Sequence, residues 1–397
     1  MPAHLLTFLT LLLGFCHCTF ASDHAYKLVG YYVSWDARRK PPFFPQEIDG
    51  NLITHLNYAF AKVDATGAIS LLAPQQDIGF AETDWKTLKS YGGNLQAIYQ
   101  LKKKYPHLKT LISFGGWTLS EPFSSLADSP KARKRFTEEL VAFCKKFHFD
   151  GVDIDWEYPC FAGHGGRPQD KQNFTLLLSD IYTAAKKQKP PLLVSIASPA
   201  TVSRYQEIEL DNIHKYVDWI NLMSYNFHGP SKGSGDEVTN HHAPLFPTKI
   251  GNPLHNTDTS VQHYLSKGVP GKKIVIGLPL YGRTYSLTKA TSDGLHIEYK
   301  GAGKGTSIKG VRSLADIKRN FLGKYTRYWD HQAQVPYLYC PQNKEFITYD
   351  DEQSLAAKCQ YVKKNHLGGV MVWQLGWDMR PDWSALRVID SALHEQN

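Results

Sequence analysis

The sequence predicts an α/β protein that folds as a (β/α)8 barrel, or TIM barrel, with a small α+β insertion between its seventh and eighth strands. Three observations lead to this prediction. Eight apolar, β-branched runs recur along the 397 residues, each is followed by a segment of helical period, and one connection is much longer than the rest. Near-continuous apolar strands between helices indicate a parallel sheet, and eight such units are the number that closes a barrel.

The eight expected strands follow one another at regular spacing, with one exception. They span residues 27–33, 51–60, 108–116, 149–157, 192–198, 217–227, 273–282 and 368–374. The exception is the connection from residue 282 to residue 368, which contains the aromatic-rich stretch YTRYWDHQAQVPYLYCPQNKEFITYDD with a turn signal at Gln342-Asn343. We therefore expect strands and a hairpin in an insertion at about 284–350, and then a helix from near Asp351 into the last strand.

The N-terminal residues predict a secretory signal peptide. The apolar stretch 5–15 is shorter than the roughly 20 residues that span a bilayer, and Thr19-Phe20-Ala21 is a small-x-small cleavage site. Residues 1–21 would be removed, which leaves a secreted chain of residues 22–397 with no membrane association. The segment before the apolar stretch lacks Lys and Arg, so an uncleaved anchor is the alternative.

Charge and cysteine content exclude several classes of function. The formal net charge is +8, but the two lysine runs, at 102–104 and 186–189, lie in helix-like segments and form no aromatic-interleaved tract. We therefore expect no nucleic-acid partner. No Cys/His spacing is typical of zinc, and we expect no metal or cofactor.

Four cysteines remain after signal cleavage. Cys144 and Cys160 bracket the 150–157 strand, whose length of about 3.3 Å per residue exceeds the separation that a disulfide allows. Cys340 and Cys359 are the remaining candidate pair.

The stretch DGVDIDWE, residues 150–157, places acidic side chains on a buried strand. Because side chains alternate along a strand, Asp153, Asp155 and Glu157 share one face and the apolar residues between them share the other. In a barrel the acidic face points inward, with Glu157 nearest the C-terminal mouth where active sites lie. Like charge and burial raise the pKa values of the carboxyl groups, so a protonated Glu157 suits a general acid. Structural salt bridges or a metal site are the alternatives.

These residues match a known pattern. DGVDIDWE resembles the DxxDxDxE signature of glycoside hydrolase family 18, the chitinases and their relatives. SFGG (113–116), MSYN (223–226), YGR (281–283) and Trp373 resemble further motifs of the family, on the expected strands three, six, seven and eight. The likeness covers residues 27 to 390, and the insertion resembles the family's α+β chitinase insertion domain.

The resemblance implies a retaining, substrate-assisted hydrolysis of chitin and chito-oligosaccharides. Glu157 would protonate the leaving oxygen and then activate water. Asp155 would stabilise the substrate's acetamido group, and Asp153 would share a proton with Asp155 from below. Tyr225 would hydrogen-bond the acetamido oxygen.

The resemblance also implies a set of substrate-binding residues. Trp373 would form the floor beneath the distorted −1 sugar, although a tryptophan that ends an apolar run is also an ordinary core residue. The other candidates lie in the same motifs or follow the first and third strands; they are Met223, Asn226, Tyr281, Arg283, Tyr31, Ser113, Trp117 and Trp35. The family often has Asp at the position of Asn226, and its absence here predicts a lower pKa for Glu157.

The sequence is therefore interpreted as a secreted, monomeric chitinase that cuts β-1,4-N-acetylglucosamine linkages. Two rival functions stay open. A chitin-binding lectin on the same barrel is disfavoured because Glu157 is present with both aspartates. An endo-β-N-acetylglucosaminidase acting on N-glycans is disfavoured because those relatives usually lack the insertion.

Overall fold

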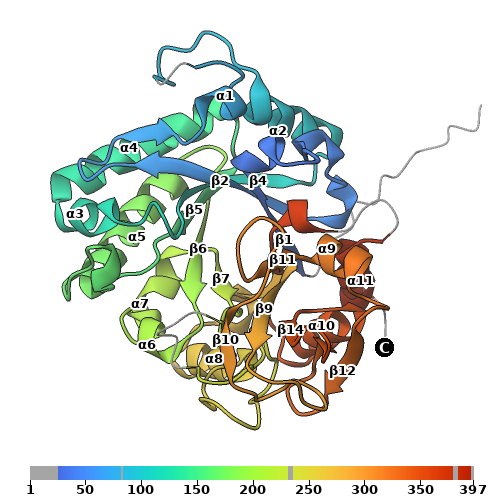
Figure 1. Cartoon of the computed structure of the whole chain (residues 1–397). Helices are drawn as coiled ribbons and strands as arrows, with labels where there is room; N and C mark the ends of the chain where they lie inside the picture. Colours follow the sequence, from blue (N-terminus) through green and yellow to red (C-terminus); the bar gives the residue numbers. More distant parts are fainter. Residues whose placement is uncertain (1–25, 82–83, 231–235, 379–382, 395–397) are drawn as a thin grey trace, which may run out of the picture.

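The computed structural model describes residues 26–81, 84–230, 236–378 and 383–394 (Figure 1). The predicted signal peptide, residues 1–21, lies outside these ranges. Within them, no helix has both the length and the apolar character needed to cross a bilayer.

Eight parallel strands form a closed barrel, which confirms the predicted fold class. Their order around the barrel follows the chain, and β1 pairs with both β2 and β15, so that the sheet has no free edge at this point. The strands are β1 (Lys27–Val33), β2 (His55–Val63), β4 (Lys109–Gly115), β5 (Gly151–Asp155), β6 (Leu193–Pro199), β7 (Trp219–Met223), β8 (Ile274–Pro279) and β15 (Gly369–Trp373). The short β3 (Ile69–Leu71) adds to β2 in antiparallel pairing.

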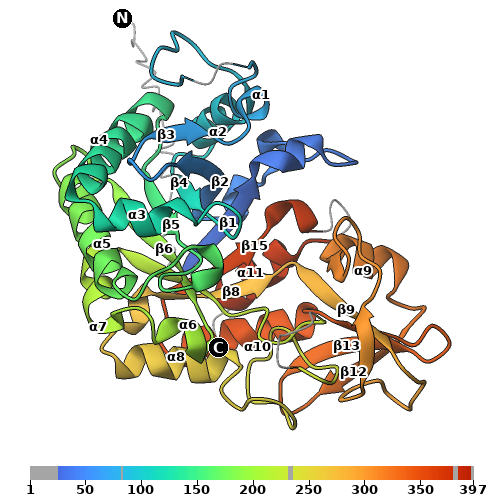
Figure 2. The ribbon, with the colours of Figure 1, turned by 60° about the vertical axis from the view of Figure 1, so that its left-hand side comes forward.

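Helices cover the outside of the barrel (Figures 1 and 2). The longer ones are α2 (Gly93–Lys104), α4 (Pro130–Phe147), α5 (Asp170–Lys186), α8 (Thr257–Ser266), α10 (Glu352–Lys364) and α11 (Ala385–His394). The shorter ones are α1 (Pro74–Asp77), α3 (Pro122–Asp128), α6 (Val202–Tyr205) and α7 (Leu210–Ile213). Another short helix, α9 (Leu314–Asn320), belongs to the insertion between β8 and β15.

The first connection departs from the expected strand–helix alternation. Between β1 and β2 the chain forms three short 3₁₀ helices, Ser34–Arg38, Pro45–Glu47 and Gly50–Leu52, in place of an α-helix. The sequence RKPPFFPQE explains the difference, because each proline lacks a backbone N–H and restricts the residue before it.

The side chains of β5 alternate as predicted. Val152, Ile154 and Trp156 belong to the large core between the strands and the helices, and Trp156 stacks on Phe123 with ring centroids 5.6 Å apart. The barrel interior has its own apolar cluster, which includes Leu111. The acidic residues of β5 therefore face the interior and its C-terminal mouth.

The insertion between β8 and β15 forms an antiparallel sheet, with strand order β10-β9-β14-β13-β12 and β11 paired to β9. Its strands are β9 (Tyr281–Leu287), β10 (Tyr299–Ala302), β11 (Val311–Ser313), β12 (Thr326–Asp330), β13 (Val335–Cys340) and β14 (Glu345–Thr348). The predicted hairpin is the β13–β14 pair. Figure 2 shows this sheet beside the barrel, next to α10.

One strand boundary differs from the prediction. The apolar run 273–282 is two strands, because β8 ends at Pro279 and β9 begins at Tyr281. Between them, the backbone N–H of Leu280 donates to the carbonyl of Trp373. Tyr281 and Arg283 therefore belong to the first strand of the insertion sheet and not to the seventh barrel strand.

The candidate pair Cys340–Cys359, which the sequence left open, is not bonded in the structure, and all four cysteines in the described part of the chain are free thiols. Cys340 ends β13, and its Sγ lies 3.3 Å from Oε1 of Gln342. Cys359 lies on α10, where its Sγ contacts the carbonyl of Ile389 in α11 at 3.9 Å. The two side chains face different neighbours, so the structure gives no support to this pairing.

Candidate active site

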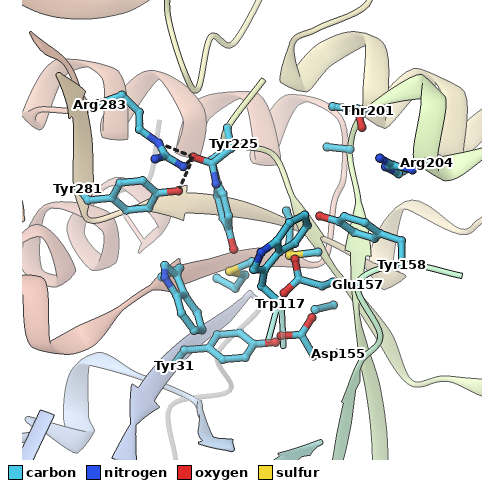
Figure 3. A pocket seen from close by; sticks show the side chains of 16 residues that line it. Tyr31, Trp117, Asp155, Glu157, Tyr158, Thr201, Arg204, Tyr225, Tyr281 and Arg283 are labelled. Carbon is cyan, nitrogen blue, oxygen red and sulfur yellow. Dashed lines mark hydrogen bonds between the residues drawn. The ribbon is translucent and has the colours of Figure 1, made fainter. Parts of the chain in front are cut away.

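The acidic residues lie at the C-terminal mouth of the barrel, at the end of β5. Asp153 and Asp155 are buried, with 0% and 3% of their surface exposed. Glu157 comes two residues after β5 ends and is partly exposed to a pocket of about 570 Å³. The three carboxyl groups therefore lead from the barrel interior to the pocket, and Figure 3 shows the last two of them, Asp155 and Glu157.

Asp153 is held by donors from four other strands. Tyr31 Oη and Ser113 Oγ both donate to Oδ2 at 2.8 Å, while Ser195 Oγ at 2.6 Å and Asn221 Nδ2 at 3.2 Å donate to Oδ1. Burial raises the pKa of Asp153, and these hydrogen bonds oppose that effect. The structure thus places Tyr31 and Ser113 against Asp153. The proton predicted between Asp153 and Asp155 stays a prediction.

Asp155 and Glu157 are coupled electrostatically. Burial raises the pKa of Asp155 well above its usual range, and the charges of Glu157 and Asp153 raise it further. Burial also raises the pKa of Glu157, to about 7, while contacts with the Tyr158 hydroxyl and the Trp117 backbone act in the opposite direction. Because close like charges and desolvation favour protonated carboxyls, this pair holds at least one proton near neutral pH.

Asp155 has an unused acceptor. Its Oδ1 is buried and has no hydrogen-bond partner within the described residues. Leaving a buried carboxylate oxygen unsatisfied costs about 1 to 3 kcal/mol or more. A polar N–H group of a bound molecule could satisfy it.

Aromatic rings form one wall of the pocket. Trp373, the last residue of β15, lies 5.5 Å from the Tyr31 ring and 6.1 Å from the Phe60 ring, which is inclined to it by 26°. Such a flat apolar surface suits the C–H face of a pyranose ring, which leaves the hydroxyl groups free for water.

Asn226 is the centre of a polar cluster at another edge of the pocket. It has a positive φ of 59° and is exposed, three residues after β7 ends at Met223. Its Oδ1 accepts from the Tyr281 hydroxyl at 2.9 Å and from Nε and Nη2 of Arg283 at 3.0 and 2.8 Å. Tyr225 lines the same pocket. The first strand of the insertion sheet thus supplies part of the barrel's cleft.

The two exposed tryptophans have different positions. Trp117 is 53% exposed and lines the pocket, where the edge of the His164 ring contacts it at 4.5 Å. Trp35 is 38% exposed but does not line this pocket; its ring lies 6.3 Å from that of Phe60. Trp35 therefore lies beyond the deep part of the cleft.

The remaining predicted residues gather as expected. Ten of the candidates line the pocket, and Asp153 and Ser113 lie beneath it; the ten are Tyr31, Trp117, Asp155, Glu157, Met223, Tyr225, Asn226, Tyr281, Arg283 and Trp373. No group of three or more His, Cys, Asp or Glu side chains in the described ranges is arranged to hold a metal ion.

Several lining residues were not predicted from the sequence. They are Tyr158, Ala197, Ala200, Thr201, Arg204 and Met371. Their position along the chain carried a signal, because Tyr158 directly follows the acidic strand and Thr201 and Arg204 follow β6. Residues just after a barrel strand lie at the catalytic face.

A closed barrel whose mouth holds two carboxyl groups of raised pKa beside an aromatic platform is the arrangement expected of a class of enzyme, the glycoside hydrolases. The model of the family "Glycosyl hydrolases family 18" matches residues 27–378. The chain belongs to this family.

Individual relatives agree with this assignment. The chain is 37% identical to chitinase A1 of Niallia circulans over an alignment 403 positions long, which covers 89% of this chain but only 57% of that protein. Among solved structures, chitinase ChiA74 from Bacillus thuringiensis matches with a TM-score of 0.85 at 34% identity, over 93% of this chain and 69% of the other. A group IV chitinase of Ostrinia furnacalis in complex with allosamidin matches with a TM-score of 0.83 at 30% identity, over 93% and 98% of the two chains.

Proposed function

We propose that this protein is a chitinase that hydrolyses β-1,4-N-acetylglucosamine linkages with retention of configuration, assisted by the substrate's own acetamido group. The observation that carries the proposal is the pair formed by Asp155 and Glu157. Glu157 faces the pocket and its pKa is raised to about 7, while buried Asp155 has a free acceptor oxygen directly beneath.

The first step forms the intermediate. A sugar on Trp373 would place its acetamido N–H toward Oδ1 of Asp155 and its acetamido oxygen toward Tyr225. That oxygen attacks the anomeric carbon as the glycosidic C–O bond breaks, and the Glu157 carboxyl gives its proton to the leaving oxygen. The products are a shortened chain and an oxazolinium ion, whose positive charge the Asp155 carboxylate stabilises.

The second step reverses the role of Glu157. Its carboxylate takes a proton from water, and the resulting hydroxide adds to the anomeric carbon from the side that the leaving group vacated. The carbon–oxygen bond of the oxazolinium ring breaks and the acetamido group is restored. Two displacements give net retention.

Product analysis with chitotetraose tests this function. The proposal expects shorter N-acetylglucosamine oligomers. A chitin-binding lectin would bind the tetramer and release nothing, and an endo-β-N-acetylglucosaminidase would instead cut the core of an N-linked glycan. We further propose that the protein is secreted as a monomer after cleavage near Ala21. We also propose that the insertion sheet forms a wall of the cleft. Membership of the family is consistent with both proposals.

Stereochemistry gives a direct prediction about the mechanism. Proton NMR of the first-formed products should detect the β-anomer before mutarotation, because two displacements retain configuration. A fully deacetylated oligomer should not be cut, since it lacks the attacking acetamido oxygen. An α-anomer appearing first would exclude the mechanism.

Asn226→Asp should move the alkaline limb of the kcat profile to higher pH. The new carboxylate would lie in the same cleft as Glu157, and like charge raises the pKa of an acid that must be protonated for the first step. Arg283, at 2.8 and 3.0 Å from Oδ1, would pair with the new charge and limit the shift to about one unit or less. Exposed Asn51→Asp is the matched control. An unmoved limb in Asn226→Asp would mean that this position is not coupled to Glu157.

A further inference from the structure

The guanidinium of Arg204 is a positive charge in the cleft that forms no ion pair with any described residue. Arg204 belongs to α6, which follows β6, and is half-buried. Its Cζ lies 4.0 Å from the centre of the Phe161 ring and 5.8 Å from that of Tyr158. Throughout the residues that the structure describes, no carboxylate forms an ion pair with it. Two aromatic rings thus lie against a cation that has no acidic partner within the described ranges.

Arg204 lies on one particular side of the proton donor. Figure 3 shows Arg204, Thr201 and Tyr158 on one side of Glu157, and Tyr31, Tyr281 and Arg283 on the other. Trp373 is beside Tyr31, at 5.5 Å. With the reacting sugar on Trp373 and Glu157 giving its proton to the glycosidic oxygen, the leaving sugar lies toward Arg204.

Among the described residues that line the pocket, the leaving side has no carboxylate that would pair with an ammonium group. Of the 16 residues that line the pocket, the acids are Asp155 and Glu157, and Glu157 is uncharged when it acts as the donor. The cation across the cleft, Arg283, is hydrogen-bonded to the neutral amide of Asn226 and not to a carboxylate. A guanidinium only donates hydrogen bonds, so it can bind an acetamido oxygen and can only repel a protonated amine.

We propose that Arg204 makes the leaving-group side of the cleft select N-acetylated sugars and reject sugars with a free, protonated amine. The substrate class is then chitin-type chains acetylated on both sides of the cut, and not partly deacetylated, cationic chains. This inference rests on the proposed function and adds a requirement beyond the acetamido group that the mechanism needs at the reacting sugar.

The test compares two tetrasaccharides. One is chitotetraose, and in the other only the third sugar from the non-reducing end is deacetylated, so that cutting the central bond places the amine beside Arg204. At a pH where the amine is protonated, kcat/KM for central cleavage should be about tenfold or more lower for the amine, as expected for two like charges a few ångströms apart in a partly buried site. The ratio of the two kcat/KM values, chitotetraose over the amine, should become smaller at high salt, because salt screens the repulsion between the two charges.

Variants of Arg204 test whether its charge causes the difference in kcat/KM between the two tetrasaccharides. Arg204→Gln should reduce the ratio to about threefold, the scale of one lost neutral hydrogen bond, and Arg204→Glu should favour the amine. Lys131→Gln on the exposed surface of α4 removes the same charge away from the cleft and should keep the wild-type ratio. Equal rates for both sugars in the wild type, or an unchanged ratio in Arg204→Gln, would overturn the proposal.

Binding separates this inference from the proposed function. Calorimetry with Glu157→Gln protein compares the affinities of the two tetrasaccharides without any turnover. If chitotetraose binds more tightly but the wild type does not cut it, the hydrolase proposal fails and the selectivity stands. If both sugars are cut alike and bind alike, the hydrolase proposal stands and the selectivity fails.

Discussion

Glu157→Gln is expected to lower kcat by about 10²- to 10⁴-fold, the contribution typical of a general acid. The amide keeps the size of the carboxyl group but has no proton to give to the leaving oxygen. Asp155, Tyr225 and the aromatic wall remain, so the affinity for chito-oligosaccharides should persist. The two measurements are single-turnover hydrolysis of chitotetraose and calorimetric binding of the same sugar.

A second glutamate provides the control. Glu121 lies four residues after Trp117, is exposed and does not line the pocket. Glu121→Gln makes the same chemical change and should leave kcat near the wild-type value. Turnover by Glu157→Gln at the wild-type rate would reassign the proton donor.

Lys358→Met is expected to lower the free energy of unfolding by about 3 to 5 kcal/mol, the cost of breaking a buried ion pair. Lys358 Nζ lies 2.6 and 2.7 Å from the two carboxylate oxygens of Asp350, and the side chains are 1% and 0% exposed. Burial lowers the pKa of Lys358, and the charge of Asp350 raises it. Removing the lysine leaves Asp350 as a buried charge without its cation.

Denaturant unfolding measures the change in the free energy of unfolding, and a double variant tests whether the unpaired charge of Asp350 causes it. Replacing both partners, in Lys358→Met with Asp350→Leu, should restore most of the lost stability because no unpaired charge remains. The comparison is the pair Arg135–Glu139, in which the Arg135 side chain is 47% exposed and Glu139 also pairs with Lys86. Arg135→Met there should cost only about 0 to 1 kcal/mol. Equal losses at both sites would show that burial of the pair does not govern its contribution.

The fold could be predicted because its strands are apolar throughout and its acidic strand has a strict period of two. The alternation of side chains predicted that Asp153 and Asp155 point into the barrel and Trp156 points outward, and the structure confirms this. The β8–β9 boundary at Leu280 was missed because it lies within a mostly apolar run. Pro279 is a local signal that a strand ends there, since proline cannot donate to a sheet ladder, but it does not indicate the change from a parallel barrel to an antiparallel sheet.

Site residues that belong to a sequence motif were predicted. Site residues whose role depends only on tertiary contacts were missed. Ser195 and Asn221 hydrogen-bond Asp153, yet each is a small or neutral polar residue in a mainly apolar strand. Their shared partner depends on how the barrel closes. Arg204 was missed because a lone arginine on a short helix resembles any surface charge. Its significance depends on the aromatic rings that hold it and on the absence of a carboxylate partner in the described structure.

The four donors to Asp153 have a consequence for how the molecule folds. Ser113 and Ser195 belong to β4 and β6, which pair directly with β5, so a partly assembled sheet already supplies them. Tyr31 and Asn221 come from β1 and β7, which do not pair with β5 and reach Asp153 only across a closed interior. In a half-formed barrel the Asp153 carboxylate would lie among apolar side chains with only part of its hydrogen bonds. Each missing donor would raise the free energy of that state by about 1 to 3 kcal/mol. The hydrogen bonds to Asp153 thus make closure of the barrel cooperative. In hydrogen exchange, the slowest-exchanging backbone amides should include those of both β1 and β5, although 122 residues separate Tyr31 from Asp153.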